Sequence, residues 1–358
     1  IAAEQFWHVS RGNPLFLREL VLSCLDAAEL TRVDGLWHAK KNLSFDAARL
    51  RDVVQARLST ADPEERHCAE LLAVGQPIGL AILQTLVGAP AIGRLEDRHA
   101  IVVEESGRRR DVSLAHPLYA EVLNRAMTRI HAREVQRELA HAISATGSRR
   151  NGDVITIGLL RIDDPEFRDA DLLLSAARKI LGDVRQAQQG ATGDPSAGAQ
   201  PSGPATSDEA LAQAGRLAER AVDAGGGFEA AQYLVRIRFW EHSDAGFADA
   251  VRRLASAAAT KEEQAHVAYW RALQHFWVEG RPDLALHELV DAQRAFPHSD
   301  ARVELQLEEL AITTWIGDIA GAQRIAARML ASPDQPPFVK ARAAQPLAIA
   351  YALAGRSK

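Results

Sequence analysis

Residues 276–285 read FWVEGRPDLA, and a related stretch, TWIGDIAGA, follows at residues 314–322. In each stretch a tryptophan stands near the end of an apolar helical run, a glycine follows it closely, and a second helical run begins. Trp240, Trp277 and Trp315 are separated by 37 and 38 residues. A period of this length with two helices per unit predicts an α-solenoid, whose units bury their apolar faces by stacking on their neighbours.

Glycines repeat with the same period. Gly280, Gly317 and Gly355 are separated by 37 and 38 residues, and Ala285 and Ala322 each lie five residues after their glycine. Small residues at this place let the two helices of a unit approach closely. We interpret the regularly spaced tryptophans as packing residues of the solenoid, and a ligand groove marked by them is the alternative.

The apolar period changes before the repeats. Residues 101–104 and 112–114 are short β-prone runs joined by the turn sequence SGRRR at residues 106–110, which is typical of a hairpin. After it, Pro117 begins a helix expected to end near residue 126, and a further helix covers 130–145. Helices followed by a terminal hairpin predict a winged-helix domain. The helical runs expected before the hairpin are 48–57, 63–73, 80–86 and 92–98.

The N-terminal part is expected to form two helices, at residues 2–9 and 15–30, with a sharp turn between them. Gly12 suits the positive φ that ends a helix, Asn13 suits a helix cap, and Pro14 suits the first turn of the next helix.

Composition excludes several classes of protein. The 358 residues carry a net charge of −5, which gives no global reason to bind nucleic acid. Cys24 and Cys68 lie in no metal-binding pattern, so we expect reduced, buried thiols and no metal site. No apolar run is long enough to span a membrane, and a cytoplasmic protein is expected. The chain starts at Ile1 and stops just after a turn glycine, so we expect it to be a piece of a longer protein with an uncapped apolar end to its array.

Candidate sites are few. His116 lies between the second hairpin strand and the helix at Pro117, where it either faces an anion or simply caps the helix. Arg108, Arg109 and Arg110 are expected at the tip of the wing, as possible contacts to a phosphate backbone or as solvated residues. The chain has no Gly-Lys dipeptide, so it lacks a phosphate-binding loop, and no hydrolase motif is present. We therefore expect no enzyme activity and no catalytic residue in this segment.

Four stretches together resemble one family. They are RGNPLFLREL at 11–20, SLAHPLYAEVL at 113–123, AERAVDAGG at 218–226 and FWVEGRPDLA at 276–285. In this order they are similar to the large ATP-binding LuxR-type transcriptional regulators of the STAND class, from the end of the AAA-type ATPase domain, through the winged helix, into the tetratricopeptide-like sensor.

The resemblance implies a signalling mechanism. In that family ADP holds the nucleotide domain against the winged helix, an inducer or a partner protein binds the repeats, and ATP then replaces ADP, with Mg²⁺ in the intact protein. The active protein self-associates and activates transcription through a C-terminal helix-turn-helix. By this resemblance Gly12 and Pro14 lie against adenine and His116 senses the diphosphate. The phosphate-binding loop and the DNA-binding helices are absent from this sequence, so the segment alone is not expected to bind ATP or DNA.

We therefore expect a mainly α chain with three parts: the end of an ATPase module at 1–47, a winged-helix domain at 48–147 and a repeat region at 153–358. Its Gly-, Pro-, Ser- and Gln-rich stretch at 186–207 is expected to be a flexible insertion. The leading function is the regulatory segment of such a regulator. The alternatives are a helical-repeat interaction scaffold without nucleotide or DNA binding, and direct DNA contact through Arg108–Arg110.

Overall fold

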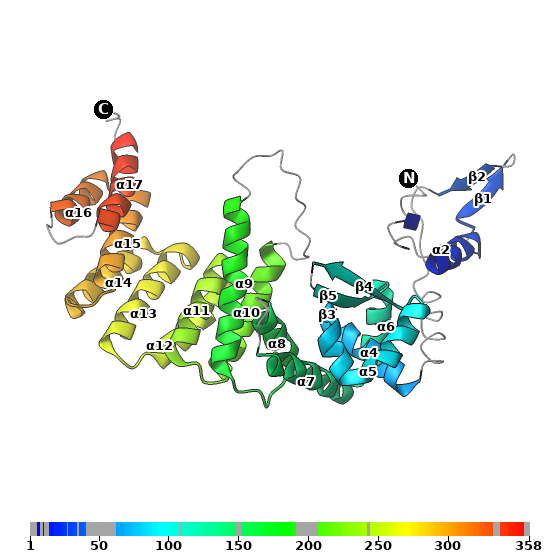
Figure 1. Ribbon diagram of the computed structural model, residues 1–358. Helices are drawn as coiled ribbons and strands as arrows, with labels where there is room; N and C mark the ends of the chain where they lie inside the picture. The colour runs from blue at the N-terminus through cyan, green and yellow to red at the C-terminus, as the bar shows by residue number, and fades with distance from the viewer. Residues whose placement is uncertain are drawn as a thin grey trace. The chain divides into compact units, whose positions relative to one another are not determined.

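The chain is mainly α-helical and falls into two compact units, Ile1–Pro165 and Glu166–Lys358 (Figure 1). The computed structural model describes residues 6, 7, 10, 14–26, 28–33, 36–40, 62–107, 109–147, 152–190, 207–241, 244–331 and 337–353. The expected fold class is confirmed, because helices around a small hairpin come first and packed helical pairs follow. Several predictions lie wholly or mostly outside the described residues: the helices at 2–9 and 48–57, Gly12, Asn13, Arg108, Gly355 and most of the insertion.

The first described helix, α2, covers Pro14–Asp26. The prediction that it continues to Leu30 is wrong, because the chain forms an antiparallel hairpin of β1 (Leu30–Val33) and β2 (Leu36–Ala39) instead. Two residues, Asp-Gly, separate the strands in the sequence, and this dipeptide is a strong signal for a hairpin turn.

The middle of the first unit has the winged-helix topology. Its elements follow in the order helix, strand, bent helix, strand, strand, and the sheet has the order β3-β5-β4. The strand β3, which the sequence did not predict, is only two residues long and pairs with β5. The elements are α4 (Pro63–Gly75), β3 (Ile78–Gly79), α5 (Leu80–Asp97), β4 (Ile101–Ser106) and β5 (Arg109–Leu114).

The bend in α5 explains why the sequence shows two helical runs there. Gly88 has φ 71° and ψ 157° within the helix, and Pro90 follows two residues later. Glycine adopts a positive φ without the steric penalty of a side chain, and proline cannot supply the helical N–H donor. The two runs predicted at 80–86 and 92–98 are therefore the two arms of one bent helix.

Ion pairs hold the second arm of α5 to the start of α4. Glu65 on α4 is only 1% exposed, and it accepts hydrogen bonds from Nε of Arg94 (2.5 Å) and Nη1 of Arg98 (2.9 Å). Arg94 also pairs with Asp62, whose Oδ1 accepts a hydrogen bond from the backbone N–H of Glu65 at 2.8 Å. A buried carboxylate is tolerated here because both of its oxygens are bound by guanidinium groups.

Three more helices complete the first unit. They are α6 (Pro117–Ala126), α7 (Arg129–Ala145) and α8 (Asp153–Arg161). The predicted helices at 117–126 and 130–145 are thus confirmed. Both α6 and α7 pack on α4, and α8 packs on α7 and α4, so helix α8 belongs to the first unit, which ends at Pro165.

The second unit is a series of helical pairs (Figure 1). Each described helix packs against its neighbours in the sequence, as stacking of repeats requires. The first helices of the pairs are α9 (Ala170–Gly190), α11 (Gly227–Trp240), α13 (Lys261–Leu273, extended by the π-helix η1, Gln274–Val278) and α15 (Arg302–Trp315). The second helices are α10 (Ser207–Asp223), α12 (Asp244–Ala257), α14 (Pro282–Ala295) and α16 (Ile319–Ala331), and α17 (Pro337–Leu353) follows.

The predicted turn chemistry of the repeats is confirmed. Gly280 and Gly317 have φ values of 64° and 82°, in the left-handed region that favours glycine. Ala285 and Ala322 are fully buried, as expected for close packing of the paired helices. One prediction needs correction: the start of the stretch 186–207 is not an irregular insertion, because α9 continues as helix to Gly190.

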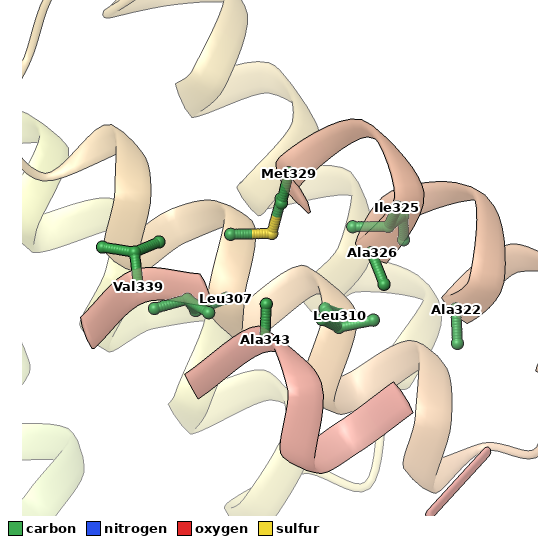
Figure 2. Packing of buried hydrophobic residues seen from close by; sticks show 8 residues of the cluster. All are labelled: Leu307, Leu310, Ala322, Ile325, Ala326, Met329, Val339 and Ala343. Atoms are coloured by element: carbon green, nitrogen blue, oxygen red, sulfur yellow. The ribbon is translucent and has the colours of Figure 1, made fainter. Parts of the chain in front are cut away.

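Small and branched apolar side chains build the core of the array. Figure 2 shows one cluster, in which residues of α15, α16 and α17 meet. In α17, Ile349 and Tyr351 are also exposed, and the uncapped apolar end expected of the array stays a prediction. The cluster comprises Leu307, Leu310, Ala322, Ile325, Ala326, Met329, Val339 and Ala343.

Candidate functional site

His116 caps the helix that follows the sheet. It is 4% exposed, its backbone is extended (φ −150°, ψ 142°), and its Nδ1 accepts a hydrogen bond from the backbone N–H of Leu118 at 3.1 Å. Because Nδ1 is the acceptor, the neutral ring carries its proton on Nε2. The structure thus shows the capping role that the sequence allowed. Sensing of a diphosphate stays a prediction, in which Nε2–H is the donor.

Pro14 begins α2 and is exposed. This position agrees with the expectation that proline occupies the first turn of the helix, where a missing N–H costs nothing. Its proposed contact with adenine needs a nucleotide-binding domain, and the contact stays a prediction.

The strands of the wing are longer than the sequence suggested. Arg109 and Arg110 are the first residues of β5, where they pair with Ser106 and Glu105 of β4, and Gly107 takes a positive φ of 61° at the turn. Both arginines are therefore in the strand ladder beside the turn, both are exposed, and their contact with a phosphate backbone stays a prediction. The composition of residues 106–110 resembles a turn, but the hairpin turn is short. Arg109 and Arg110 therefore form part of the hydrogen-bonded strand pair.

The charges on the second arm of α5 do not favour DNA. The second arm of α5 is where such domains present a recognition helix, and here it exposes Glu96 and Asp97. Its two arginines, Arg94 and Arg98, are held by Glu65. Acidic side chains repel the phosphate backbone. A guanidinium paired with Glu65 can contact a phosphate only if that ion pair breaks, which leaves the buried carboxylate unpaired at a cost in free energy.

A cavity of about 460 Å³ lies within the first unit, between the C-terminal end of α4, the strand β3, and helices α7 and α8. Its polar lining includes Arg109, Gln76, Gln136, Asp153 and Thr156. No local pattern in the sequence predicts this cavity, because its walls come from segments far apart in the chain.

The tryptophans of the repeats are exposed. Trp240, Trp277 and Trp315 retain 57%, 54% and 68% of their accessible surface, so the prediction that they pack inside the solenoid is wrong. Trp240 and Trp315 are the last residues of α11 and α15, and Trp277 lies in η1 at the end of α13. The rings of Trp277 and Trp315 touch edge to face, with centroids 6.4 Å apart.

Carboxylates accompany these tryptophans. Glu279 accepts a hydrogen bond from the His275 ring at 2.7 Å, and this bond holds the pKa of Glu279 below its usual value. Asp283 is bound by Arg281, which lowers the pKa of Asp283 in the same way. Asp318 accepts a hydrogen bond from the N–H of Gly321 at the start of α16. We call Trp240, Trp277, Trp315, Glu279, Asp283 and Asp318 the tryptophan edge.

A partly buried polar pair that the sequence did not single out, Tyr269 and Glu308, lies between α13 and α15. Burial raises the pKa of Glu308, and a hydrogen bond from Tyr269 partly opposes this shift. Burial beside Glu308 and Glu304 likewise raises the pKa of Tyr269. Tyr269 and Glu308 both lie within helical stretches of regular apolar periodicity, so nothing in the sequence distinguishes them from surface residues.

Cys24 and Cys68 are both buried and unpaired with each other, as predicted. Burial raises the pKa of the Cys68 thiol to about 12. Among the described residues, no cluster of three histidine, cysteine or acidic side chains is placed to hold a metal ion. In the same part of the chain, none of the helices combines the length and apolar character that crossing a bilayer requires.

These features define a class of protein: a winged-helix unit joined in one chain to an array of helical pairs. No family model matches the sequence, and no curated protein matches it. Among solved structures, the fold is similar to a signal transduction ATPase with numerous domains (STAND) from Pyrococcus horikoshii that has a tetratricopeptide repeat sensor, with 13% sequence identity and a TM-score of 0.35. The match covers 97% of this chain and 53% of the other, so this chain spans about half the length of that protein.

Proposed function

We propose that this chain is the regulatory segment of a STAND-type, ATP-dependent regulator of the LuxR family. In this proposal the repeat array receives an inducer or a partner protein, and the winged-helix unit passes the signal to a nucleotide-binding domain. One observation carries the proposal. The winged-helix topology of α4 to β5 is followed in the same chain by stacked helical pairs, in the order expected from the sequence resemblance.

The position of His116 fits a nucleotide sensor. It follows the last strand of the sheet and precedes the N-terminal end of α6, where backbone N–H groups and the helix dipole favour an anion. The hydrogen bond from Leu118 to Nδ1 fixes the orientation of the ring. An Nε2–H group is chemically suited to donate to a phosphate oxygen. The segment itself supplies no catalytic group in this proposal, and hydrolysis of ATP belongs to the nucleotide-binding domain.

An interaction scaffold without nucleotide is the second candidate. The observation that favours it is the exposed tryptophan edge, which offers a surface for a partner whether or not ATP is bound. The coding sequence around the chain separates the two candidates. A phosphate-binding loop upstream and a helix-turn-helix downstream support the regulator, and the absence of both supports the scaffold.

The decisive experiment is calorimetric titration of ADP and ATP into the natural protein, including any region that precedes this chain. Two variants separate the roles of His116. His116→Asn keeps a side-chain acceptor for the helix cap, whereas His116→Ala removes both the cap and the ring. His141→Ala, at an exposed position on α7, is the matched control.

If His116 senses the diphosphate, both His116 variants lose ADP affinity by about tenfold or more, ATP affinity changes less, and His141→Ala is unchanged. If His116 only caps α6, His116→Asn binds ADP normally and His116→Ala is merely less stable. Failure of the natural protein to bind either nucleotide refutes the regulator and leaves the scaffold.

A further inference from the structure

We propose that the tryptophan edge is a docking surface for a basic segment of a partner protein, with arginine or lysine side chains at alternate positions. The proposal deepens the function above, because it rests on the repeat array being the part that receives a partner. Four properties of the edge support it: exposure, rigidity, charge and spacing.

The exposure is unusual for tryptophan. Three indoles that each keep more than half of their surface in contact with water, at one position of successive helical pairs, make a repeated apolar feature. Indoles are enriched at the energetic centres of protein interfaces because they bury a large area while losing little rotamer freedom.

The indoles are also held in place. Phe276 is partly buried against the core cluster that contains Leu289, and its ring centroid lies 4.9 Å from that of Trp277, so the neighbouring ring supports the exposed one. Trp277 lies in the π-helix η1, and such irregular turns occur frequently at functional sites. Trp240 is supported in the same manner by Phe239, at 6.4 Å. Preorganised rings lose less entropy on binding.

The charge around the indoles is negative. The turns that follow them, residues 241–244, 278–283 and 316–318, contain five carboxylates, one arginine and one histidine. Glu279, Asp283 and Asp318 are exposed at these turns, and Glu279 and Asp283 are stabilised in their ionised forms. Carboxylates in the turns that follow exposed aromatic rings favour a cationic partner, because both groups attract a cation. A second copy of the same acidic edge is disfavoured by like charge.

The spacing suits an extended chain. The centroids of Trp277 and Trp315 are 6.4 Å apart. Successive residues of an extended strand rise about 3.3 Å, so side chains two positions apart are separated by about 6.6 Å on the same side. The spacing of side chains at alternate positions of an extended peptide therefore matches the spacing of the two indoles.

The test uses the whole chain and a fluorescently labelled synthetic peptide with arginines at alternate positions. Matched peptides carry leucine or glutamate at those positions. Binding is measured by fluorescence anisotropy at low and at physiological salt. The protein variants are Trp277→Ala, Trp315→Ala and Glu279→Gln, and the control is Trp37→Ala, because Trp37 is 58% exposed on the hairpin strand β2 of the first unit.

We expect the arginine peptide to bind and the leucine and glutamate peptides not to bind. Trp277→Ala and Trp315→Ala should each weaken binding of the arginine peptide by about fivefold or more. Glu279→Gln should weaken it by a few fold, with a smaller salt dependence, and Trp37→Ala should leave it unchanged. Circular dichroism checks that each variant remains folded.

Three outcomes overturn the proposal. They are equal binding of the leucine and arginine peptides, insensitivity to both tryptophan variants, and a concentration-dependent dimer in sedimentation velocity that Trp277→Ala abolishes. None of these outcomes changes the nucleotide titration, and a failed nucleotide titration leaves the peptide result intact. The docking surface and the nucleotide switch can therefore be refuted separately.

Discussion

The contact between Gly75 and Leu139 leaves no room for a methyl group. Gly75 is the last residue of α4, and a Cβ atom placed on it would overlap Cδ2 of Leu139 on α7 and lie 3.8 Å from Cδ2 of Leu160. Leu139 is fully buried, so its side chain cannot move aside into solvent. We predict that Gly75→Ala destabilises the first unit, although alanine is the better helix former.

The magnitude follows from two opposing effects. Replacing glycine by alanine within a helix contributes about 1 kcal/mol of stability, whereas forcing a methyl group against a buried side chain costs about 1–3 kcal/mol. The expected net effect of Gly75→Ala is a loss of about 1 kcal/mol. In a Leu139→Ala background, which alone costs about 2–5 kcal/mol, the clash is gone and the same substitution should stabilise by about 1 kcal/mol. The effect of Gly75→Ala on stability therefore changes sign between the two backgrounds. The coupling free energy between the two substitutions is about 2 kcal/mol.

Hydrogen exchange measured by mass spectrometry is the suitable assay, because a chain of two units need not unfold in one step. Peptides from α4 and α7 report the local free energy of opening, and peptides from α13 and α14 serve as an internal reference that should not change. Additive effects of the two substitutions, or stabilisation by Gly75→Ala in both backgrounds, would refute the described packing of α4 on α7.

Three further predictions concern single groups. Glu65→Gln should lower the stability of the first unit by about 2 kcal/mol in the same exchange assay, because one amide oxygen cannot replace a buried carboxylate that binds Arg94 and Arg98. Hydrogen bonds from Ser299 and from the backbone N–H groups of residues 300 and 301 lower the pKa of Glu262, so its stabilisation is complete above the ordinary pKa of 4.5 and is lost as pH falls through the lower folded value. The stability difference between the native chain and Glu262→Gln should thus be constant from pH 5 to 7, within about 0.3 kcal/mol, and shrink below about pH 4. Because burial raises the pKa of Cys68 to about 12, its thiol should not react with a thiol reagent at about pH 8 until urea unfolds the unit, and rapid reaction of the folded protein would contradict its burial.

Local signals in the sequence predicted much of the fold. Pro117 at the first turn of α6, the glycines at the repeat turns and the β-prone runs of the wing each act through nearby backbone geometry, so they can be recognised without the tertiary structure. The hairpin at residues 30–39 also had such a signal, the Asp-Gly dipeptide between Val33 and Leu36. It was missed because the apolar helical period of α2 was extended across it.

Other features depend on contacts between distant segments. The strand β3 exists only because Ile78 and Gly79 pair with Val112 and Asp111, and two residues are too short to show a period. The cavity beside Arg109 and the partial burial of Glu308 arise in the same way, from elements that meet only after folding. Chemical type alone could not reveal them.

The tryptophans show why exposure is hard to predict from a repeat. An apolar period predicts burial only where another element covers the helix, and Trp240 and Trp315 are the terminal residues of their helices. The buried contacts of the pairs are made instead by small residues such as Ala285, in a cluster with Leu289 and Phe276. Because the indoles lie outside this cluster, replacing them should cost less than about 1 kcal/mol of stability. The array can therefore keep its fold while the tryptophan edge changes, which separates what stabilises the repeats from what binds a partner.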